Sequence, residues 1–274
     1  MFSAGHLIWI ALCALLIGGG LAACFRLRPS LDRVLTIGLV LALVSEVVKF
    51  FSVIQVLPVV VPVVSGAEVT YQATGDFTPY LRIDHFPFEL CSIQIFVLLA
   101  LRLIRDPVWR RRLLAFFYGT ASLGGLMGIL LCTTAAELHT AADFFNSPRP
   151  WQYFLYHSII VTLGVYTGFA PESGLTFRDV GVCTAGVICL DVLTFYGNSM
   201  LNDPVYLGTR DPVGVTHVVN FFSSYQNPLG MTMTEVWQWM LYLVIRAALA
   251  ILLLCLVFLP LRNRKPAAGK EAAL

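Results

Sequence analysis

The stretch His85-Phe-Pro-Phe-Glu-Leu-Cys-Ser-Ile-Gln94 lies where a polar loop becomes an apolar segment. It carries a carboxylate at Glu89, a thiol at Cys91 and an amide at Gln94 into that segment. A helix that only crosses lipid needs none of these groups, because a polar group in hydrocarbon costs free energy unless it finds a partner. The stretch therefore predicts a membrane helix that opens onto a polar site.

The composition is that of a polytopic membrane protein. Of 274 residues, 58% are hydrophobic and only 12% are charged. The net charge of +2 is too small to suggest a nucleic-acid partner. The seven cysteines form no C-x-x-C pair and have no histidine at ligand spacing, which argues against a zinc site or a dithiol redox centre. We expect no metal and no cofactor.

Seven apolar runs are long enough to cross a bilayer, so the expected fold is an all-α bundle of seven transmembrane helices. Proline-containing breaks at Arg28-Pro29, Asp106-Pro107, Ala170-Pro171 and Leu259-Pro260 fall at proposed helix ends. One transmembrane domain is expected over residues 1–261, followed by a disordered cytoplasmic tail at 262–274. The predicted spans cover residues 5–25, 34–57, 86–104, 113–133, 151–170, 180–200 and 236–260.

Basic residues set the expected orientation. Arginines and lysines gather in alternate connections, near residues 26–33, 105–112 and 262–270, whereas the loops at 58–85, 134–150 and 201–235 carry mostly acidic charge. Basic connections stay in the cytoplasm. We therefore expect an outer amino terminus and a cytoplasmic carboxyl terminus, and a lid or short interfacial helix within the loop at 201–235.

A cysteine and a histidine meet at one depth in this arrangement. Cys91 in the third span and His157 in the fifth both enter from outside, about 8–10 Å below the outer boundary. Cys91 and Gln94 are three residues apart and share a helix face, whereas Glu89 points away from that face, towards a neighbouring helix. An imidazole is the usual base that turns a thiol into a nucleophile.

Other polar side chains converge on the same leaflet. On the sixth span, Thr184, Asp191 and Asn198 belong to one stripe, which predicts a face turned to the interior of the bundle. Glu46 and Lys49 on the second span have the spacing of an internal ion pair, although Lys49 also has the charge to attract a lipid phosphate.

The residues resemble a known family. Phe86-Pro-Phe-Glu-Leu-Cys91 resembles the P-L-H-L-C signature of the YwaF-like integral membrane proteins, which include a eukaryotic multipass acyltransferase that remodels ether phospholipids. Tyr153-Phe-Leu-Tyr-His157-Ser and the stretch from Gly197-Asn198 to Leu207-Gly-Thr209 are similar to further family segments, and the resemblance extends over residues 30–260. The chain departs from the family pattern at Glu89, where the family has histidine, and at Gly208-Thr-Arg210-Asp211.

The resemblance implies a cysteine–histidine acyltransferase, with Cys91 as nucleophile and His157 as base. The expected reaction moves an acyl chain from a phospholipid to a lysophospholipid through a thioester. Gln94, Asn198 or a backbone amide would hold the oxyanion, and Asp191 would orient the histidine. The expected location is a bacterial cytoplasmic membrane, with the site facing the outer leaflet.

Two other classes of function fit the same residues. A transporter, lipid scramblase or proton-coupled carrier would use Glu46, Lys49, Glu89 and Asp191, and would tolerate loss of the thiol. A lipid hydrolase would share the first half-reaction and use water in the second. The sequence does not specify the head group, the acyl chain or the oligomeric state.

Overall fold

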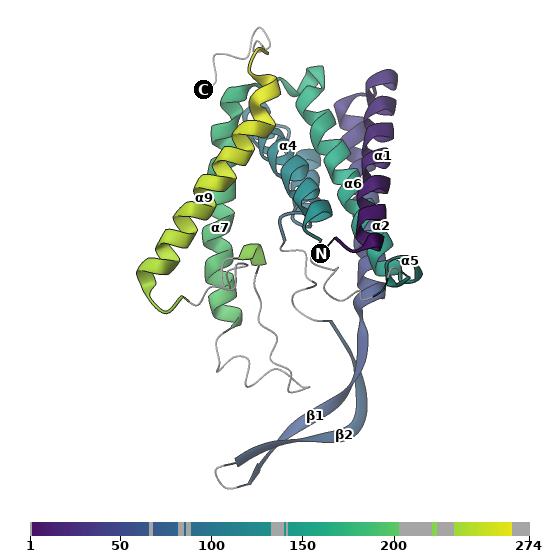
Figure 1. Cartoon of the computed structure of the whole chain (residues 1–274), viewed down its shortest axis with the longest axis vertical. Coiled ribbons are helices and arrows are strands. Elements are labelled where there is room, and N and C mark those ends of the chain that lie inside the picture. Colours follow the sequence, from purple (N-terminus) through teal and green to yellow (C-terminus); the bar gives the residue numbers. More distant parts are fainter. Residues whose placement is uncertain are drawn as a thin grey trace.

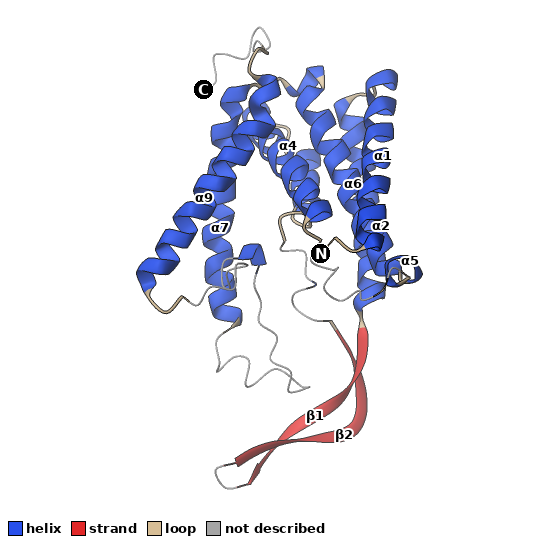
Figure 2. Cartoon of the chain, viewed as in Figure 1, coloured by secondary structure: helices blue, strands red, loops and turns tan. Residues whose placement is uncertain are grey.

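The computed structural model describes residues 2–65, 68–81, 85, 89–132, 140, 142–202, 221–223 and 233–264. Helices dominate this part of the chain (Figures 1 and 2). The helices are α1 (Ala4–Leu27), α2 (Leu31–Val53), α3 (Gln94–Leu103), α4 (Pro107–Leu130), α5 (Asp143–Asn146), α6 (Pro148–Phe169), α7 (Val180–Leu201) and α9 (Val236–Phe258). Short 3-10 turns cover Pro171–Ser173, Phe177–Asp179, Phe221–Ser223 and Leu259–Leu261.

Local sequence explains where these helices begin and end. Asp106 caps α4 by accepting the backbone N–H groups of Val108 and Trp109 at 3.0 and 2.9 Å, directly before Pro107. Arg28 ends α1 in the left-handed conformation. All four predicted proline breaks lie at helix ends, as the bounds of α1, α4, α6 and α9 show.

Among the described residues, five helical segments are long and apolar enough to cross a membrane: α1, α2, α4, Phe177–Leu201 and Val236–Leu261. α6 has 22 residues and is long enough to cross a membrane, but it is more polar than these five. It lies in the centre of the bundle against α1, α2 and α4. These features support an all-α membrane bundle.

The third predicted span is shorter than expected. The chain forms turns over residues 89–93, and α3 has only ten residues, which is about 15 Å of helix and half of the hydrocarbon thickness. An apolar run of 19 residues was expected to be helical throughout. Hydropathy alone does not locate the first helical residue, which here is Gln94.

A β-hairpin interrupts the helical fold. β1 (Gln55–Ser65) pairs antiparallel with β2 (Glu68–Tyr80) and projects beyond the helices (Figure 2). The sequence predicted a loop from residue 58 and helix up to 57, and both assignments are wrong. The segment is rich in valine, which favours strands, and Pro58 and Pro62 remove helical donors. The register shifts between Pro58 and Val60.

The predicted cytoplasmic connections meet at one end of the bundle. Asp32 pairs with Arg102 at 3.3 Å and with Arg110, and Arg111 holds Asp179 through two bonds of 3.1 and 3.0 Å. These contacts join the basic connections at 26–33 and 105–112 to each other and to the turn before α7. At the same end, Arg264 donates to the carbonyls of Gly168 and Ala170, and Tyr166 donates to Pro29.

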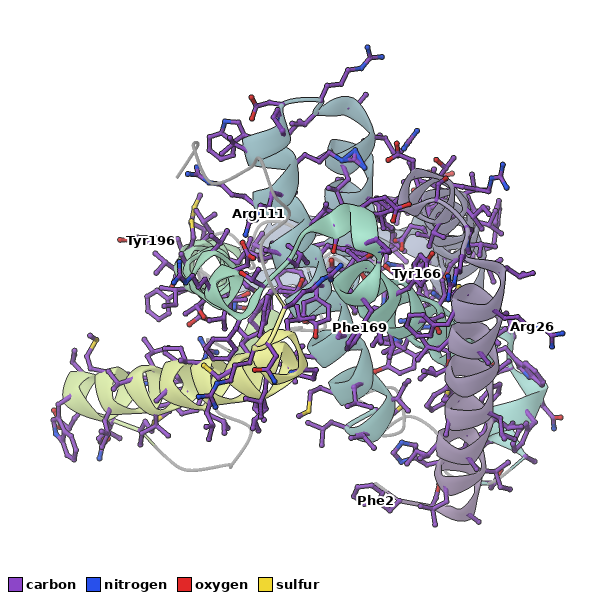
Figure 3. The ribbon with its side chains drawn as sticks, turned by 90° about the horizontal axis from the view of Figure 1, so that it is seen from above. Phe2, Arg26, Arg111, Tyr166, Phe169 and Tyr196 are labelled. Atoms are coloured by element: carbon purple, nitrogen blue, oxygen red, sulfur yellow. The ribbon has the colours of Figure 1, made fainter. Side chains whose placement is uncertain are left out.

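The core lies around α4 and α6, while α7 and α9 are mostly exposed. Glycines on α4 and α6 allow close approach: a Cβ at Gly164 would lie 2.7 Å from the Ser122 hydroxyl, and one at Gly168 would lie 2.3 Å from the Tyr118 ring. A second core cluster joins α1 to α5 and α6 around Trp9. α9 leans away from α1 in both views (Figures 1 and 3).

Candidate active site

Cys91 lies in the turn that precedes α3 and is only partly buried. Its carbonyl accepts a 2.8 Å hydrogen bond from the Tyr156 hydroxyl and a 3.3 Å bond from the backbone of Gln94. Its Sγ lies 3.9 Å from the Ser92 hydroxyl. α6 thus holds the turn in place, and Ser92 supplies a polar contact to the sulfur.

His157 is buried on α6, with 2% of its surface exposed. Its Nδ1 lies 2.7 Å from the Tyr153 carbonyl. A carbonyl only accepts, so Nδ1 carries the proton of the neutral ring and Nε2 keeps a lone pair. The Tyr153 ring lies 4.2 Å from the imidazole, and its hydroxyl donates to the Gly128 carbonyl at 2.9 Å. Nε2 is therefore the nitrogen available to accept a proton.

One face of α4 packs against both Leu90 and His157. A Cβ at Gly124 would lie 3.1 Å from the Leu90 side chain, and one at Gly128 would lie 2.5 Å from His157 Nε2. These glycines are four residues apart, so they share one face of α4 about 6 Å apart. Leu90 and His157 therefore cover neighbouring turns of the same face.

Cys91 and His157 lie the same number of residues from the end of the bundle that holds the arginines. Each is twelve residues from a helix end, Leu103 of α3 (103 − 91) and Phe169 of α6 (169 − 157). For His157 this is about 18 Å along α6, whereas Cys91 lies in the turn before α3 begins. Within the described residues, no hydrogen bond joins the thiol to the imidazole.

Gln94 begins α3 and is fully buried. Its Nε2 donates to the Leu90 carbonyl at 2.8 Å and to the Thr120 hydroxyl at 3.0 Å, while its Oε1 has no partner among the described residues. Both amide hydrogens are therefore engaged, and the oxygen is the group left open. The Gln94 side chain is therefore suited to accept a hydrogen bond through its oxygen, and it is less suited to the predicted role of donating hydrogen bonds to an oxyanion.

Asn198 binds the backbone of another segment. Its Nδ2 donates to the Phe221 carbonyl at 2.8 Å, and its Oδ1 accepts the Phe221 N–H at 3.0 Å. The side chain is fully buried and fixes the short turn at Phe221–Ser223 onto α7. The amide that was expected to face an oxyanion instead positions this turn.

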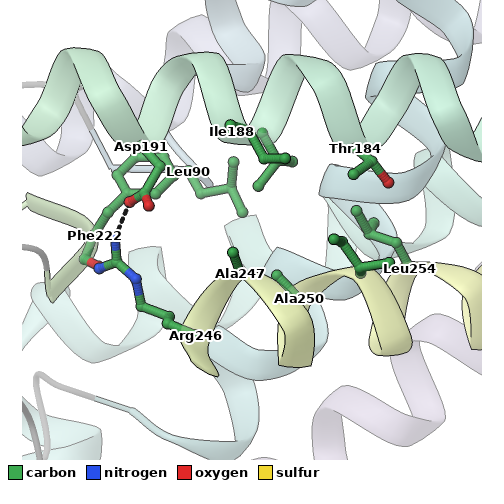
Figure 4. A pocket seen from close by; sticks show the side chains of 11 residues that line it. Leu90, Thr184, Ile188, Asp191, Phe222, Arg246, Ala247, Ala250 and Leu254 are labelled. Atoms are coloured by element: carbon green, nitrogen blue, oxygen red, sulfur yellow. Dashed lines mark hydrogen bonds and ion pairs between the residues drawn. The ribbon is translucent and has the colours of Figure 1, made fainter. Parts of the chain in front are cut away.

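Asp191 does not orient His157, which corrects that expectation. It forms an ion pair with Arg246 of α9, and Arg246 also donates to the Phe222 carbonyl at 2.5 Å (Figure 4). Of the predicted polar stripe on α7, Thr184 and Asp191 line a cavity beside α9, and Asn198 is buried. Only the tertiary structure identifies Arg246 as the partner.

The remaining predicted residues have different surroundings. Lys49 is buried and forms the predicted ion pair with Glu46 on the same helix. Glu89 is exposed, and its carbonyl accepts the Ile93 N–H at 2.9 Å. Most of the loop predicted at 201–235 to hold a lid or a short interfacial helix, residues 203–220 and 224–232, lies outside the described residues, as does the predicted tail from residue 265 onward.

Sequence reasoning missed three residues of this region. Tyr156 precedes the histidine and was read only as part of an aromatic run, and Ser92 was overlooked beside the thiol. Arg246 had a usable signal, because an arginine in the middle of a membrane helix marks a functional site or a buried pair.

Long apolar helices around a buried polar centre define a multipass integral membrane protein. A sequence model of the TMEM164 family matches residues 1–258, and the chain belongs to this family of multipass membrane proteins. No curated protein and no solved structure matches the chain.

Proposed function

We propose that this protein is a phospholipid acyltransferase that works through a thioester on Cys91. One observation carries the proposal: the Cys91 turn is bonded to α6 by Tyr156, next to a histidine whose Nε2 is the basic nitrogen. A thiol against an apolar core stays protonated unless a base removes its proton. A neutral imidazole is suited to that task.

The reaction balances with these two side chains. His157 Nε2 takes the thiol proton while Sγ bonds to the ester carbonyl carbon of a phospholipid. The carbon–oxygen bond then breaks, the lysophospholipid leaves with the proton from His157, and the acyl chain remains as a thioester. In the second half, His157 deprotonates the hydroxyl of an acceptor lysophospholipid, which attacks the thioester and releases the thiol.

Two elements near Cys91 suit the negative charge that forms in each half-reaction. The Ser92 hydroxyl lies 3.9 Å from the sulfur, and the amino-terminal end of α3 favours negative charge. The side-chain amides of Gln94 and Asn198 are engaged elsewhere, which leaves a backbone amide as the proposed oxyanion donor.

The proposed placement follows the basic residues. The end that holds the arginine network would face the cytoplasm, which places the amino terminus outside. The same proposal includes seven membrane spans, a site that opens towards the outer leaflet, and location in a bacterial cytoplasmic membrane. The substrates would then be phospholipids and lysophospholipids of the surrounding bilayer.

The test uses the purified full-length chain and a phospholipid with a labelled acyl chain. We expect a labelled adduct that hydroxylamine removes, and that is absent in Cys91→Ala. Cys189→Ala is the matched control, because it removes an exposed thiol of α7 and should keep the adduct. Equal labelling of the wild type and Cys91→Ala would refute the assignment of Cys91 as the nucleophile.

The fate of the adduct separates the enzyme classes. A transferase should lose the label faster when lysophospholipid is added, and the label should appear in a new phospholipid. Release of free fatty acid at a rate independent of lysophospholipid would instead identify a hydrolase.

A further inference from the structure

The α9 helix is anchored to the bundle at one end only. Of its residues Val236–Phe258, only Leu254 and Phe258 are buried, and both lie at its carboxyl end. There the Phe258 ring packs edge-on against Tyr118 of α4 at 4.8 Å, and the Tyr118 hydroxyl donates to the Val257 carbonyl at 2.5 Å. The free part of α9, residues 236–250, leans outward from the bundle (Figure 1). This free part therefore depends on its contacts with α7.

A polar cluster supplies those contacts. Asp191 of α7 forms an ion pair with Arg246 of α9, and Arg246 also donates to the Phe222 carbonyl at 2.5 Å (Figure 4). We call Asp191, Arg246 and this carbonyl the latch. Phe222 has a φ of 57°, which is strained for a bulky residue, and Asn198 holds the preceding residue to α7 through two bonds of 2.8 and 3.0 Å. The latch thus joins the free part of α9 to α7.

A cavity of about 160 Å³ lies beside the latch, between α7 and α9 (Figure 4). Ala247 and Ala250 line it from α9, where their small side chains leave the space unfilled. Within the described part of the chain, Leu90 is its only wall residue outside α7, α9 and the Phe222 turn. Leu90 directly precedes Cys91. The seam between α7 and α9 therefore leads towards the proposed nucleophile.

These contacts define a hinge at the anchored end of α9. Arg246 lies eight residues before Leu254 (254 − 246), which is about 12 Å along the helix. A rotation of about 15° around Leu254 would move Arg246 by about 3 Å, which is enough to break both of its bonds. The same rotation would widen the seam at Ala247 and Ala250, while the contacts of Phe258 stay in place.

We propose that the latch controls access from the bilayer to Cys91, by holding the free part of α9 against α7 until the helix swings outward. The inference rests on the proposed function, because access from the bilayer matters to the reaction only if a lipid reacts at Cys91. Separated charges are costly inside a membrane, so the ion pair favours the closed state. Ala247 and Ala250 add little apolar contact, which leaves the latch to set the balance between the closed and open states.

The experiment measures how fast N-ethylmaleimide alkylates Cys91 in the full-length chain in lipid nanodiscs, read from the mass of the Cys91 peptide. This readout needs no acyl transfer. Arg246→Met keeps the length of the side chain but removes its donors, and should raise the Cys91 rate about tenfold. Adding Asp191→Asn leaves no unpaired charge and should keep the rate high. The charge-swapped pair Asp191→Arg with Arg246→Asp should return the rate towards that of the wild type.

Two other cysteines show whether the change is local. Cys183 is buried on α7 beside the anchored end of α9, where a Cβ at Gly119 would meet both its sulfur and the Phe258 ring. It should stay unreacted in every variant. Cys189 is exposed on α7 and should react at one rate in all of them. Arg111→Gln breaks an ion pair at the arginine-rich end and should leave the Cys91 rate unchanged.

Two results would overturn the proposal. One is a Cys91 rate that stays at the wild-type value in folded Arg246→Met. The other is reaction of Cys183 together with Cys91, because it would mean that the ion pair only stabilises the fold. Hydrogen exchange of the wild type adds a test that needs no variant. The backbone of residues 236–250 should exchange at least about tenfold faster than that of residues 251–258, and equal protection along α9 would reject the hinge.

The two proposals fail separately. Latch variants that expose Cys91, in a protein that forms no lipid adduct, would retain the moving helix and reject the thioester. A Cys91 adduct in a protein whose alkylation rate does not respond to the latch variants would retain the thioester and reject the control of access.

Discussion

Gly128→Ala tests whether His157 needs its present position. An alanine Cβ there would lie 2.3 Å from His157 Cδ2 and 2.5 Å from Nε2. Carbon atoms pack no closer than about 3.5 Å, so the ring must move by about 1 Å. Its Nδ1 bond to the Tyr153 carbonyl and its contact with the Tyr153 ring oppose that movement.

The expected effects on stability and rate differ in size. Replacing a helix glycine by alanine normally stabilises a helix by about 1 kcal/mol, whereas overpacking a core costs about 1–3 kcal/mol. The net destabilisation should therefore be no more than about 2 kcal/mol. A general base contributes roughly 10²–10⁴ in rate, so displacing it should slow adduct formation at least about a hundredfold.

The assay pairs thermal unfolding with the rate of hydroxylamine-sensitive labelling. Two glycines serve as controls. Gly19 has open space around its Cβ position, so Gly19→Ala should be neutral or stabilising with an unchanged rate. Gly124→Ala meets only the flexible end of Leu90 and should have a smaller effect than Gly128→Ala. A folded Gly128→Ala protein that labels at the wild-type rate would refute the role of the imidazole.

Two other predictions concern the supports of the site. Tyr156→Phe removes the 2.8 Å bond to the Cys91 carbonyl and should cost about 1 kcal/mol of stability and slow labelling, whereas Tyr166→Phe, which removes a bond to Pro29, should cost stability without a change in rate. Glu46→Gln leaves Lys49 uncompensated and should lower the unfolding temperature, and adding Lys49→Met should restore both stability and labelling. A double variant that folds but is inactive would favour the transporter class instead.

The arrangement of the helix ends could be predicted from the sequence. Arginines accumulate in alternate connections, which predicts that these connections lie on one side, and the contacts of Asp32 and Asp179 hold basic residues together at one end. The ion pair of Glu46 and Lys49 was predictable for a similar reason, since both residues lie on one helix and their spacing is fixed by helical geometry.

The hairpin and the short α3 were not predictable from hydropathy. Hydropathy identifies a span from the length and summed apolar character of a run. The β-branched residues of Gln55–Ser65 and the turn before Gln94 do not lower that summed hydropathy. In the hairpin, proline removes helical donors. Before α3, a tertiary contact, the bond from the Tyr156 hydroxyl to the Cys91 carbonyl, holds the turn.

The sequence by itself determined an apolar helical bundle and its arginine-rich end, because these depend on composition and on the distribution of charge along the chain. The tertiary structure decided the partners. Asp191 faces Arg246 and not His157, and Asn198 holds Phe221, because contacts between helices depend on how each helix is rotated and packed. Periodicity fixes the face that a side chain occupies, and only packing fixes the residue opposite it.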